Sequence, residues 1–551
     1  MKKRILLGSI ATLLAVWSVS LPAAINDPVK TDAGLLSGTM QEGVRVYKGI
    51  PFGAPPVGPL RWKDPQPVAK WDGVRKADQY GNVCVQPSQK QRFPNNVSVD
   101  LPDSPKVSED CLYLNVWTDA KSASEKRPVM VWIFGGAYSE GAGSSPHNEG
   151  WALAKKGVIV VTLNYRLGPF GFFSHPELDK ESGHNASGNQ AVGDCIAALR
   201  WVQKNIAAFG GDPKNVTIFG ESAGAALNGG LVGSPMTKGL FQRAISESGA
   251  WMGLSMARMR SREDAERPPA PRGGGPGRPG GAGAPAAAPP PPLPTSLAEL
   301  RAMSTDDVSR RLRGAGMIVD GYWIPEDESV TFADGRQQPV DVLVGSNKDE
   351  GAFQPTRSIT PEQYEQQIRA QWGDLADEYL KLNPGKTSEE ATAASEHIFR
   401  DNMHWHMRLY ADDMAKKGKN AWLYFFTHET KPAPGQRGLR AVHTAEIPYV
   451  FNNLRSPRVY PDNSDVEFES KNPENIALAD QVSQYWVNFA RTGDPNGKGL
   501  PSWPAFKDKA SSHAMELGPS APEPDHATMA LYDRLYERQI MTPLRSAAAT
   551  K

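Results

Sequence analysis

The chain has 551 residues, of which 39% are hydrophobic and 22% charged, proportions typical of a globular protein with a large core. Its 61 basic and 61 acidic side chains give no net charge, so the sequence gives no electrostatic support for a nucleic-acid partner. Length alone allows several average domains or one large enzyme domain, and it leaves the oligomeric state open.

The first 24 residues have the pattern of an export signal. Basic residues at 2–4 precede an apolar run over 5–19, and small residues suited to cleavage follow. An uncleaved membrane anchor is the alternative, but the apolar run is short and Pro22 and polar sequence follow it at once. We therefore expect a cleaved signal peptide over 1–24, a periplasmic or secreted protein, and no stable insertion in a membrane.

The three cysteines of an exported chain allow one disulfide and leave one thiol over. Cys84 and Cys111 flank a polar stretch typical of a surface loop, so they are the expected pair. Closing that loop would stabilise the fold by roughly 3–4 kcal/mol in the chain-entropy model. Cys195 lies in a helix-like segment and is expected to be buried and inert.

No metal site is predicted from the sequence, because it contains neither paired CxxC motifs nor an HExxH motif. His404 and His406 are two residues apart, so on a helix they would point to different faces. We interpret them as scattered helix residues rather than as ligands.

Strand-like and helix-like stretches alternate in the middle of the chain. Apolar runs over 129–133 and 157–163 are typical of buried strands, and 189–207 has the character of a helix. A further strand is predicted at 216–219. Strands that alternate with helices indicate a largely parallel sheet covered on both faces.

The most informative motif follows the strand at 216–219. Gly220-Glu221-Ser222-Ala223-Gly224 places a serine on a strand-to-helix turn, where its hydroxyl projects from the backbone and the glycines allow close approach. The N–H groups that begin the next helix would face negative charge developing beside that hydroxyl. An ordinary Gly/Ser turn is the alternative, since short patterns also arise by chance.

Backbone donors for such a charge are predicted after the strand at 129–133. Small residues in Phe134-Gly135-Gly136-Ala137-Tyr138 leave N–H groups unshielded, and with the N–H of Ala223 they would surround an oxyanion. Taken alone, a plain glycine-rich turn is the better interpretation of this segment.

Nearly every residue from Pro268 to Pro294 is Pro, Gly or Ala. Such sequence has few large side chains to bury, so a disordered segment is expected. A domain linker is the alternative to a disordered insertion. We favour an insertion, because the sequence on both sides is needed to complete one site.

A serine nucleophile needs a base and a carboxylate that orients it, and in hydrolases of this kind the chain order is Ser, acid, His. Asp349 and Glu350 follow a predicted strand at 340–344, and either carboxylate would serve; a solvated charged turn is the alternative. His443 lies in a loop after a strand-like run at 422–426, which suits an active-site base. From the residues alone its rivals stay open: His397, His404, His406, His428, His513 and His526.

Several long motifs give the chain a strong resemblance to a known family. They are Lys48–Gly53, Pro55–Gly58, Ser108–Asn115, Phe209–Pro213 continuing to the Ser222 motif, Gly345–Gly351 and the His443 segment. From about residue 30 to 540 the chain resembles the type-B carboxylesterases, the α/β-hydrolase group that includes cholinesterases and bacterial para-nitrobenzyl esterases.

The resemblance implies an α/β-hydrolase fold and the hydrolysis of small carboxylic esters through an acyl-enzyme, without a cofactor. It implies that Ser222 is the nucleophile, His443 the base and Glu350, rather than Asp349, the orienting acid. It also implies oxyanion N–H groups from Gly136, Ala137 and Ala223, the disulfide Cys84–Cys111, a buried ion pair of Arg61 with Glu109, and a place for Glu221 in the pocket lining.

Departures from the family pattern limit what the resemblance says of the substrate. Phe134 and Ala137 replace residues common in relatives without removing a backbone donor. The only aromatic residue between the two cysteines is Phe93, so the cation–π platform of cholinesterases is absent.

Two other functions would be compatible with this fold. A transacylase or amidase would use the same residues. A non-catalytic binding protein of this fold would be expected to lack the nucleophile, which is present here.

Overall fold

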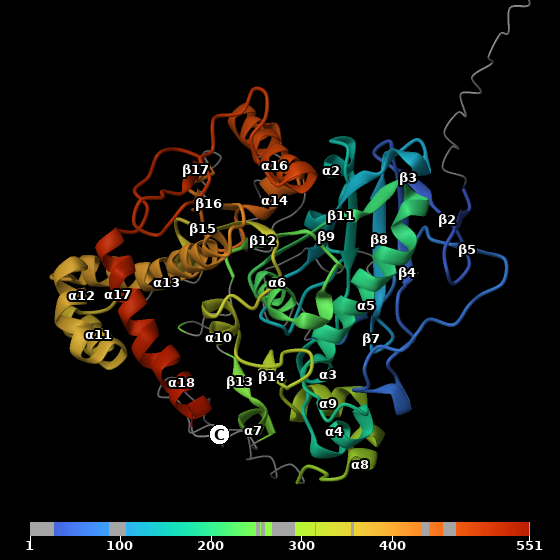
Figure 1. Ribbon diagram of the computed structural model, residues 1–551, viewed down its shortest axis with the longest axis horizontal. Helices are drawn as coiled ribbons and strands as arrows, with labels where there is room; N and C mark the ends of the chain where they lie inside the picture. Colours follow the sequence, from blue (N-terminus) through green and yellow to red (C-terminus); the bar gives the residue numbers. More distant parts are fainter. Residues whose placement is uncertain are drawn as a thin grey trace, which may run out of the picture.

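In a computed structural model, the described residues are 27–86, 106–249, 254, 259–266, 292–314, 316–353, 358–430, 440–455 and 470–549. Their centre is a ten-stranded sheet (Figure 1). In spatial order its strands are β17 (Met515–Leu517), β16 (Ala421–Phe426), β15 (Asp341–Asn347), β12 (Arg243–Glu247), β11 (Gly211–Glu221), β9 (Arg127–Ile133), β10 (Ile159–Leu163), β8 (Tyr113–Thr118), β4 (Val44–Pro51) and β3 (Thr39–Gln41).

Seven neighbouring strands of this sheet, from β17 to β10, are parallel, while β8, β4 and β3 pair antiparallel. The side chains of β10 are all buried, as expected of a β-branched strand with helices on both faces. The prediction of a mostly parallel, helix-covered sheet is therefore confirmed.

Helices cover both faces of the sheet (Figure 1). One face carries α2 (Trp151–Lys155) and α16 (Pro473–Thr492); the other carries α5 (Gln190–Asn205), α6 (Ala223–Gly233) and α13 (Ser388–Lys416). The remaining helices are α3 (Gly168–Gly171), α4 (Pro176–Ser182), α7 (Arg262–Glu266), α8 (Leu297–Ala302), α9 (Thr305–Arg311), α10 (Glu328–Ala333), α11 (Pro361–Trp372), α12 (Ala376–Leu382), α14 (Ile447–Val450), α17 (His526–Tyr536) and α18 (Thr542–Ala549).

Among the described residues, three smaller sheets accompany the large one. They are formed by β1 (Val29–Lys30), β2 (Leu35–Ser37) and β5 (Val74–Lys76), by β6 (Val83–Cys84) and β7 (Val107–Ser108), and by β13 (Arg260–Ser261) and β14 (Ile318–Val319).

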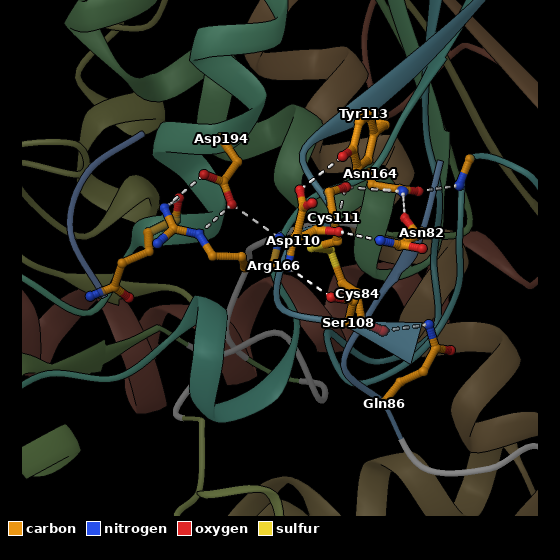
Figure 2. The surroundings of a disulfide bond; sticks show 12 residues. Asn82, Cys84, Gln86, Ser108, Asp110, Cys111, Tyr113, Asn164, Arg166 and Asp194 are labelled. Carbon is orange, nitrogen blue, oxygen red and sulfur yellow. Dashed lines mark hydrogen bonds and ion pairs between the residues drawn. A yellow bond between two sulfur atoms is a disulfide. The ribbon is translucent and has the colours of Figure 1, made fainter. Parts of the chain in front are cut away.

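A disulfide joins Cys84, at the end of β6, to Cys111 just before β8 (Figure 2). Cys195 is a buried free thiol in α5. Near the disulfide, Arg61 donates two hydrogen bonds to the Glu109 carboxylate, at 2.7 and 2.6 Å. The cysteine pair and the ion pair are those that the sequence resemblance implies.

A second ion pair, Arg166 with Asp194, lies deeper and is almost fully enclosed. Nε and Nη2 of Arg166 donate to the two carboxylate oxygens at 2.8 and 2.7 Å, and its backbone N–H donates to the same carboxylate at 3.0 Å (Figure 2). The charges match one to one, and the pair ties the loop after β10 to α5.

Three segments singled out in the sequence lie wholly or mainly outside the described residues. They are the signal peptide at 1–24, the greater part of the stretch between Cys84 and Cys111, including Phe93, and all but the last three residues of the Pro/Gly/Ala tract at 268–294. Two strands of the large sheet, β12 before that tract and β15 after it, pair directly with each other. Across the described residues, no helix has the length and apolar character needed to span a membrane.

Candidate active site

Ser222 occupies the sharp turn between β11 and α6. Its backbone has φ 55° and ψ −122°, a conformation that costs about 1–3 kcal/mol for a residue with a side chain. Two backbone hydrogen bonds hold the turn. The Ser222 N–H donates to the backbone carbonyl of Glu247 at 2.8 Å, and the Ser222 carbonyl accepts the backbone N–H of Ala226 at 2.9 Å. The strain is thus fixed by β12 on one side and by the first turn of α6 on the other.

The glycines two residues before and after Ser222 are required by close packing. A Cβ atom at Gly220 would lie 2.4 Å from the carbonyl oxygen of Ile133, and one at Gly224 would lie 2.0 Å from the same atom. The end of β9 therefore presses directly against the turn, and any side chain at these two positions would push it away.

His443 links Ser222 to a carboxylate. Its Nε2 lies 2.8 Å from the Ser222 hydroxyl oxygen, and its Nδ1 lies 2.6 Å from Oε2 of Glu350. Glu350 is fully buried three residues after β15, and its Oε1 accepts the backbone N–H of Asn347, the last residue of that strand, at 2.9 Å. The three side chains come from segments far apart in the sequence and occur in the order Ser, Glu, His.

Asp349, the alternative acid, is engaged elsewhere. Its carboxylate accepts hydrogen bonds from Arg440, at 2.5 Å, and from the backbone N–H of Ala441, at 3.2 Å. The Asp349 N–H in turn donates to the Ala441 carbonyl at 2.9 Å. Asp349 thus anchors the start of the loop that carries His443, and Glu350 is the carboxylate that faces the imidazole.

The predicted oxyanion segment lies beside the nucleophile. Backbone φ is positive at Gly136, Ala137 and Tyr138 (108°, 52° and 58°), so the chain turns sharply after β9. A Cβ atom at Gly135 would lie 3.0 Å from Cβ of Ser222, which shows how closely the two segments approach. Ala223 is the first residue of α6, so its N–H has no partner within that helix.

Glu221 adds a second carboxyl group at the imidazole. It is buried, and its Oε1 lies 3.2 Å from Nε2 of His443. Burial raises the pKa of Glu221 well above its usual range. Burial alone would lower the pKa of His443, but the carboxyl groups of Glu221 and Glu350 outweigh it and raise that pKa to about 10. Two carboxyl groups therefore lie beside the imidazole, and both favour its protonated form.

Three further groups near the site were not predicted from the sequence. The Asn347 side chain donates to the Val442 carbonyl, at 2.9 Å, and to the Glu446 carboxylate, so it fixes the histidine loop. Glu247, at the end of β12, accepts the Trp486 indole N–H at 2.7 Å. Burial raises the pKa of Glu446 to about 7 and that of Glu247 well above its usual range. Glu446 lies only three residues after His443, so its closeness to the imidazole could have been predicted from the sequence.

The rival histidines lie in other surroundings. His404 and His406 are fully buried in α13, and His428 contacts Asn475 at 2.8 Å. His513 and His526 lie on either side of β17 and its following loop. Of the histidines considered as the base, only His443 contacts the Ser222 hydroxyl among the interactions of the described residues.

The chain is similar to carboxylesterases both in sequence and in structure. The model of the carboxylesterase family matches residues 26–268 and 294–530. The chain is 36% identical to fumonisin B1 esterase of Sphingopyxis macrogoltabida, covering 90% of this chain and 88% of the relative. It is 34% identical to para-nitrobenzyl esterase of Bacillus subtilis, covering 87% and 93%.

Among solved structures, a carboxylesterase of Geobacillus stearothermophilus superposes with a TM-score of 0.71 at 34% identity, covering 89% of this chain and 96% of the other. A para-nitrobenzyl esterase structure gives a TM-score of 0.68 at 32% identity, covering 87% and 93%. These neighbours have the α/β-hydrolase fold.

Proposed function

The chain belongs to the carboxylesterase family, and from this premise we propose that it hydrolyses carboxylic esters through an acyl-enzyme formed on Ser222. The observation that supports this proposal most directly is the pair of contacts made by His443, at 2.8 Å to Ser222 and 2.6 Å to Glu350. A hydroxyl, an imidazole and a buried carboxylate in this order are the parts that nucleophilic acyl transfer needs.

In the acylation half, Nε2 of His443 takes the proton of the Ser222 hydroxyl as the oxygen attacks the ester carbonyl. Nδ1–H of His443 donates to Glu350, which holds the tautomer and stabilises the imidazolium that forms. The tetrahedral oxyanion accepts hydrogen bonds from the N–H groups of Gly136, Ala137 and Ala223. His443 then gives the proton to the departing alcohol.

In the deacylation half, water takes the place of the alcohol. His443 removes a proton from the water, the resulting oxygen attacks the acyl carbonyl, and the same donors hold the second oxyanion. The acid leaves as the proton returns to Ser222. Loss of one backbone or side-chain donor at such a site typically lowers kcat by about 10²–10³.

The test of this proposal is replacement of the nucleophile. Ser222→Ala should lower kcat for a para-nitrophenyl ester by roughly 10⁴ or more while the melting temperature stays close to that of the parent. Ser511→Ala, an exposed serine in the loop before β17, is the matched control and should keep full activity. When the parent is treated with an ester whose acyl group is hydrolysed slowly, mass spectrometry should find that acyl group on the peptide that contains Ser222. Retained activity in Ser222→Ala would overturn the assignment.

A transferase that uses the same site would pass the acyl group to an acceptor other than water. Product distributions measured in water alone and with added alcohols or amines separate the two cases. We propose hydrolysis because the named relatives are esterases. A dominant acyl-transfer product at low acceptor concentration would favour the alternative.

We also propose that the protein is exported. The charged and apolar pattern of residues 1–24 supports this, and so does the Cys84–Cys111 disulfide, because disulfides persist mainly in oxidising compartments. Expression of the full chain followed by intact-mass analysis of the periplasmic or secreted fraction should give a product lacking the first two dozen residues or so. Full-length protein confined to the cytoplasm would contradict the proposal.

A further inference from the structure

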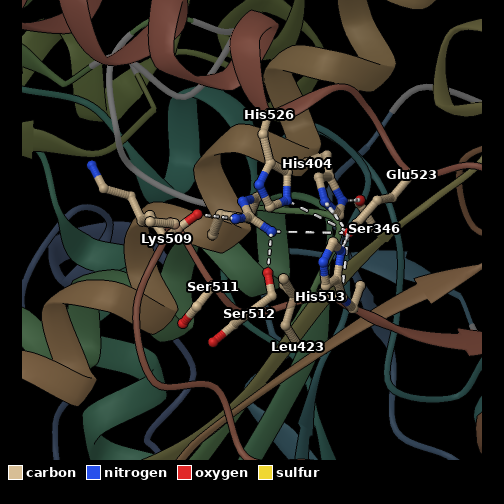
Figure 3. A network of polar contacts seen from close by, with 12 residues as sticks. Ser346, His404, Leu423, Lys509, Ser511, Ser512, His513, Glu523 and His526 are labelled. Carbon is tan, nitrogen blue, oxygen red and sulfur yellow. Dashed lines mark hydrogen bonds and ion pairs between the residues drawn. The ribbon is translucent and has the colours of Figure 1, made fainter.

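Three titratable side chains converge at the loop between β17 and α17. His513 precedes β17, Glu523 lies in the loop, and His526 is the first residue of α17. One ligand-type atom from each lies within 4.8 Å of the others. Oε1 of Glu523 contacts Nδ1 of His513 and lies 3.7 Å from Nε2 of His526, and Figure 3 shows the three side chains close together.

Hydrogen bonding accounts for only part of this arrangement. Nε2 of His526 is shielded from solvent and has no hydrogen-bond partner among the described residues. Both imidazoles approach the same carboxylate oxygen, and their rings lie nearly parallel with their centres 5.0 Å apart. Two imidazole nitrogens and one carboxylate oxygen are a donor set suited to a transition-metal cation.

We propose that His513, Glu523 and His526 bind one divalent transition-metal cation of the zinc type. Two imidazoles and one carboxylate are ligands that Zn²⁺ accepts, at about 2.0–2.2 Å, with water in the fourth position. The His513 side chain is 73% exposed, so it is free to rotate by the small amount needed to bring its nitrogen and the carboxylate oxygen onto a shared metal. The harder cations Ca²⁺ and Mg²⁺ prefer oxygen ligands and would bind poorly.

The carboxylate of Glu523 is held from the side opposite the two histidines. Its Oε2 accepts the Ala514 N–H at 3.2 Å and lies 3.4 Å from Nε2 of His404, which is fully buried in α13. Partners of this kind orient a metal-binding carboxylate. The Arg408 guanidinium, 3.9 Å from Oε2, repels a cation and makes the site weaker than fully enclosed zinc sites. We therefore expect a dissociation constant on the order of 1 μM.

Binding at this place would stabilise the fold rather than take part in ester cleavage. The cation would join the segment before β17 to the start of α17 and close the loop between them. Through Glu523 and His404 the loop is also connected to Ser346 of β15, whose hydroxyl lies 3.1 Å from Nδ1 of His404 (Figure 3). A ligand that binds only the folded chain raises its stability in proportion to the logarithm of the ligand concentration.

The experiment is a zinc titration of the full chain after treatment with EDTA and dialysis. Calorimetry on the parent should show one site that Ca²⁺ and Mg²⁺ do not fill, and about 100 μM Zn²⁺ should raise the melting temperature by a few degrees. His513→Gln and His526→Gln should each weaken that site at least about tenfold. His513 is exposed, so its replacement should not impair folding.

Two controls separate this site from other histidines. His175→Gln, at the residue before α4, should bind zinc like the parent. His443→Gln should also keep the site, which excludes binding at the catalytic histidine. The proposal is wrong if the parent binds no zinc stoichiometrically, if His513→Gln and His526→Gln bind as tightly as the parent, or if His443→Gln alone abolishes binding.

Discussion

Two buried polar regions of this protein differ in how their charges balance. Between the loop after β10 and α5, one guanidinium meets one carboxylate, and Arg166 and Asp194 match donor to acceptor. Around His443, three buried carboxyl groups, those of Glu221, Glu350 and Glu446, share a single imidazole. A fourth buried carboxyl group, that of Glu247, interacts with Glu446 and Glu221.

The difference separates a region that serves folding from a region suited to the proposed chemistry. A balanced buried pair is satisfied as it stands and loses stability when either partner is removed. A surplus of carboxyl groups cannot all be ionised in a buried space, so the pKa values of Glu221, Glu247 and Glu446 are raised. Such a cluster holds protons close to the base, a state that is unfavourable for stability but useful for proton transfer.

The largest expected effect separates the two neighbouring acids of the β15 loop. Glu350→Gln keeps the shape of the side chain but removes the charge that orients His443, so kcat for ester hydrolysis should fall by roughly 10³–10⁴. Asp349→Asn is the matched control, because Asp349 binds Arg440 and not the imidazole. It should lower kcat by less than about tenfold. Similar losses in both variants would leave the orienting acid unassigned.

A carboxyl-to-amide change in the balanced region should act on stability instead. Asp194→Asn leaves the Arg166 guanidinium buried without a counter-charge and should lower the free energy of unfolding by about 3–5 kcal/mol. Urea denaturation of the variant and the parent at pH 7 measures this change in the free energy of unfolding. A loss below about 1 kcal/mol would mean that the pair is not the stabilising contact described above.

A carboxyl-to-amide change among the carboxyl groups near His443 should instead increase stability at high pH relative to the parent. The pKa of Glu247 is higher in the folded chain than in the unfolded chain, because burial disfavours its ionised form. Its contribution to stability is complete below the unfolded pKa and is lost as the pH rises through the folded pKa. Glu247→Gln cannot ionise and escapes this loss, while its carbonyl oxygen still accepts the Trp486 N–H.

Denaturation of Glu247→Gln and the parent at pH 5 and pH 8 tests this expectation. The free energy of unfolding of the variant relative to the parent should rise by about 1 kcal/mol or more between the two values. A difference that is independent of pH, or that falls, would show that Glu247 ionises normally in the folded chain.

The smallest expected effect is a displacement of the pH profile. Glu221→Gln removes a carboxyl group that raises the pKa of His443. Because the base must be neutral to act, activity falls as the pH drops through that pKa, and a lower pKa moves the fall to lower pH. The acid limb of the kcat/KM profile should therefore shift to lower pH, and kcat on the plateau should change by less than about tenfold. An unmoved limb would show that Glu221 does not influence the imidazole.

Much of this architecture could be predicted because it is encoded locally. The strand over 216–219, the glycines around Ser222 and the helix that follows are contiguous, and their structure agrees with the pattern. The choice between Asp349 and Glu350 could not be made from local sequence, since it depends on whether Arg440 occupies one of them. Glu247 became part of the site only through the pairing of β11 with β12, a contact that no short motif records. The proximity of the histidines at 513 and 526 could not be predicted from the sequence either, because it depends on the fold of the loop between β17 and α17.

The tight fit of Gly220 and Gly224 against the Ile133 carbonyl has a consequence for redesign. The segment that carries the proposed nucleophile and the segment proposed to hold the oxyanion are packed against each other, so neither can move independently. A chimera that exchanged 133–137 with a relative while keeping 220–224 would have to reproduce the backbone path of Ile133 to keep the two segments in contact. Successful exchanges should carry both stretches from the same parent.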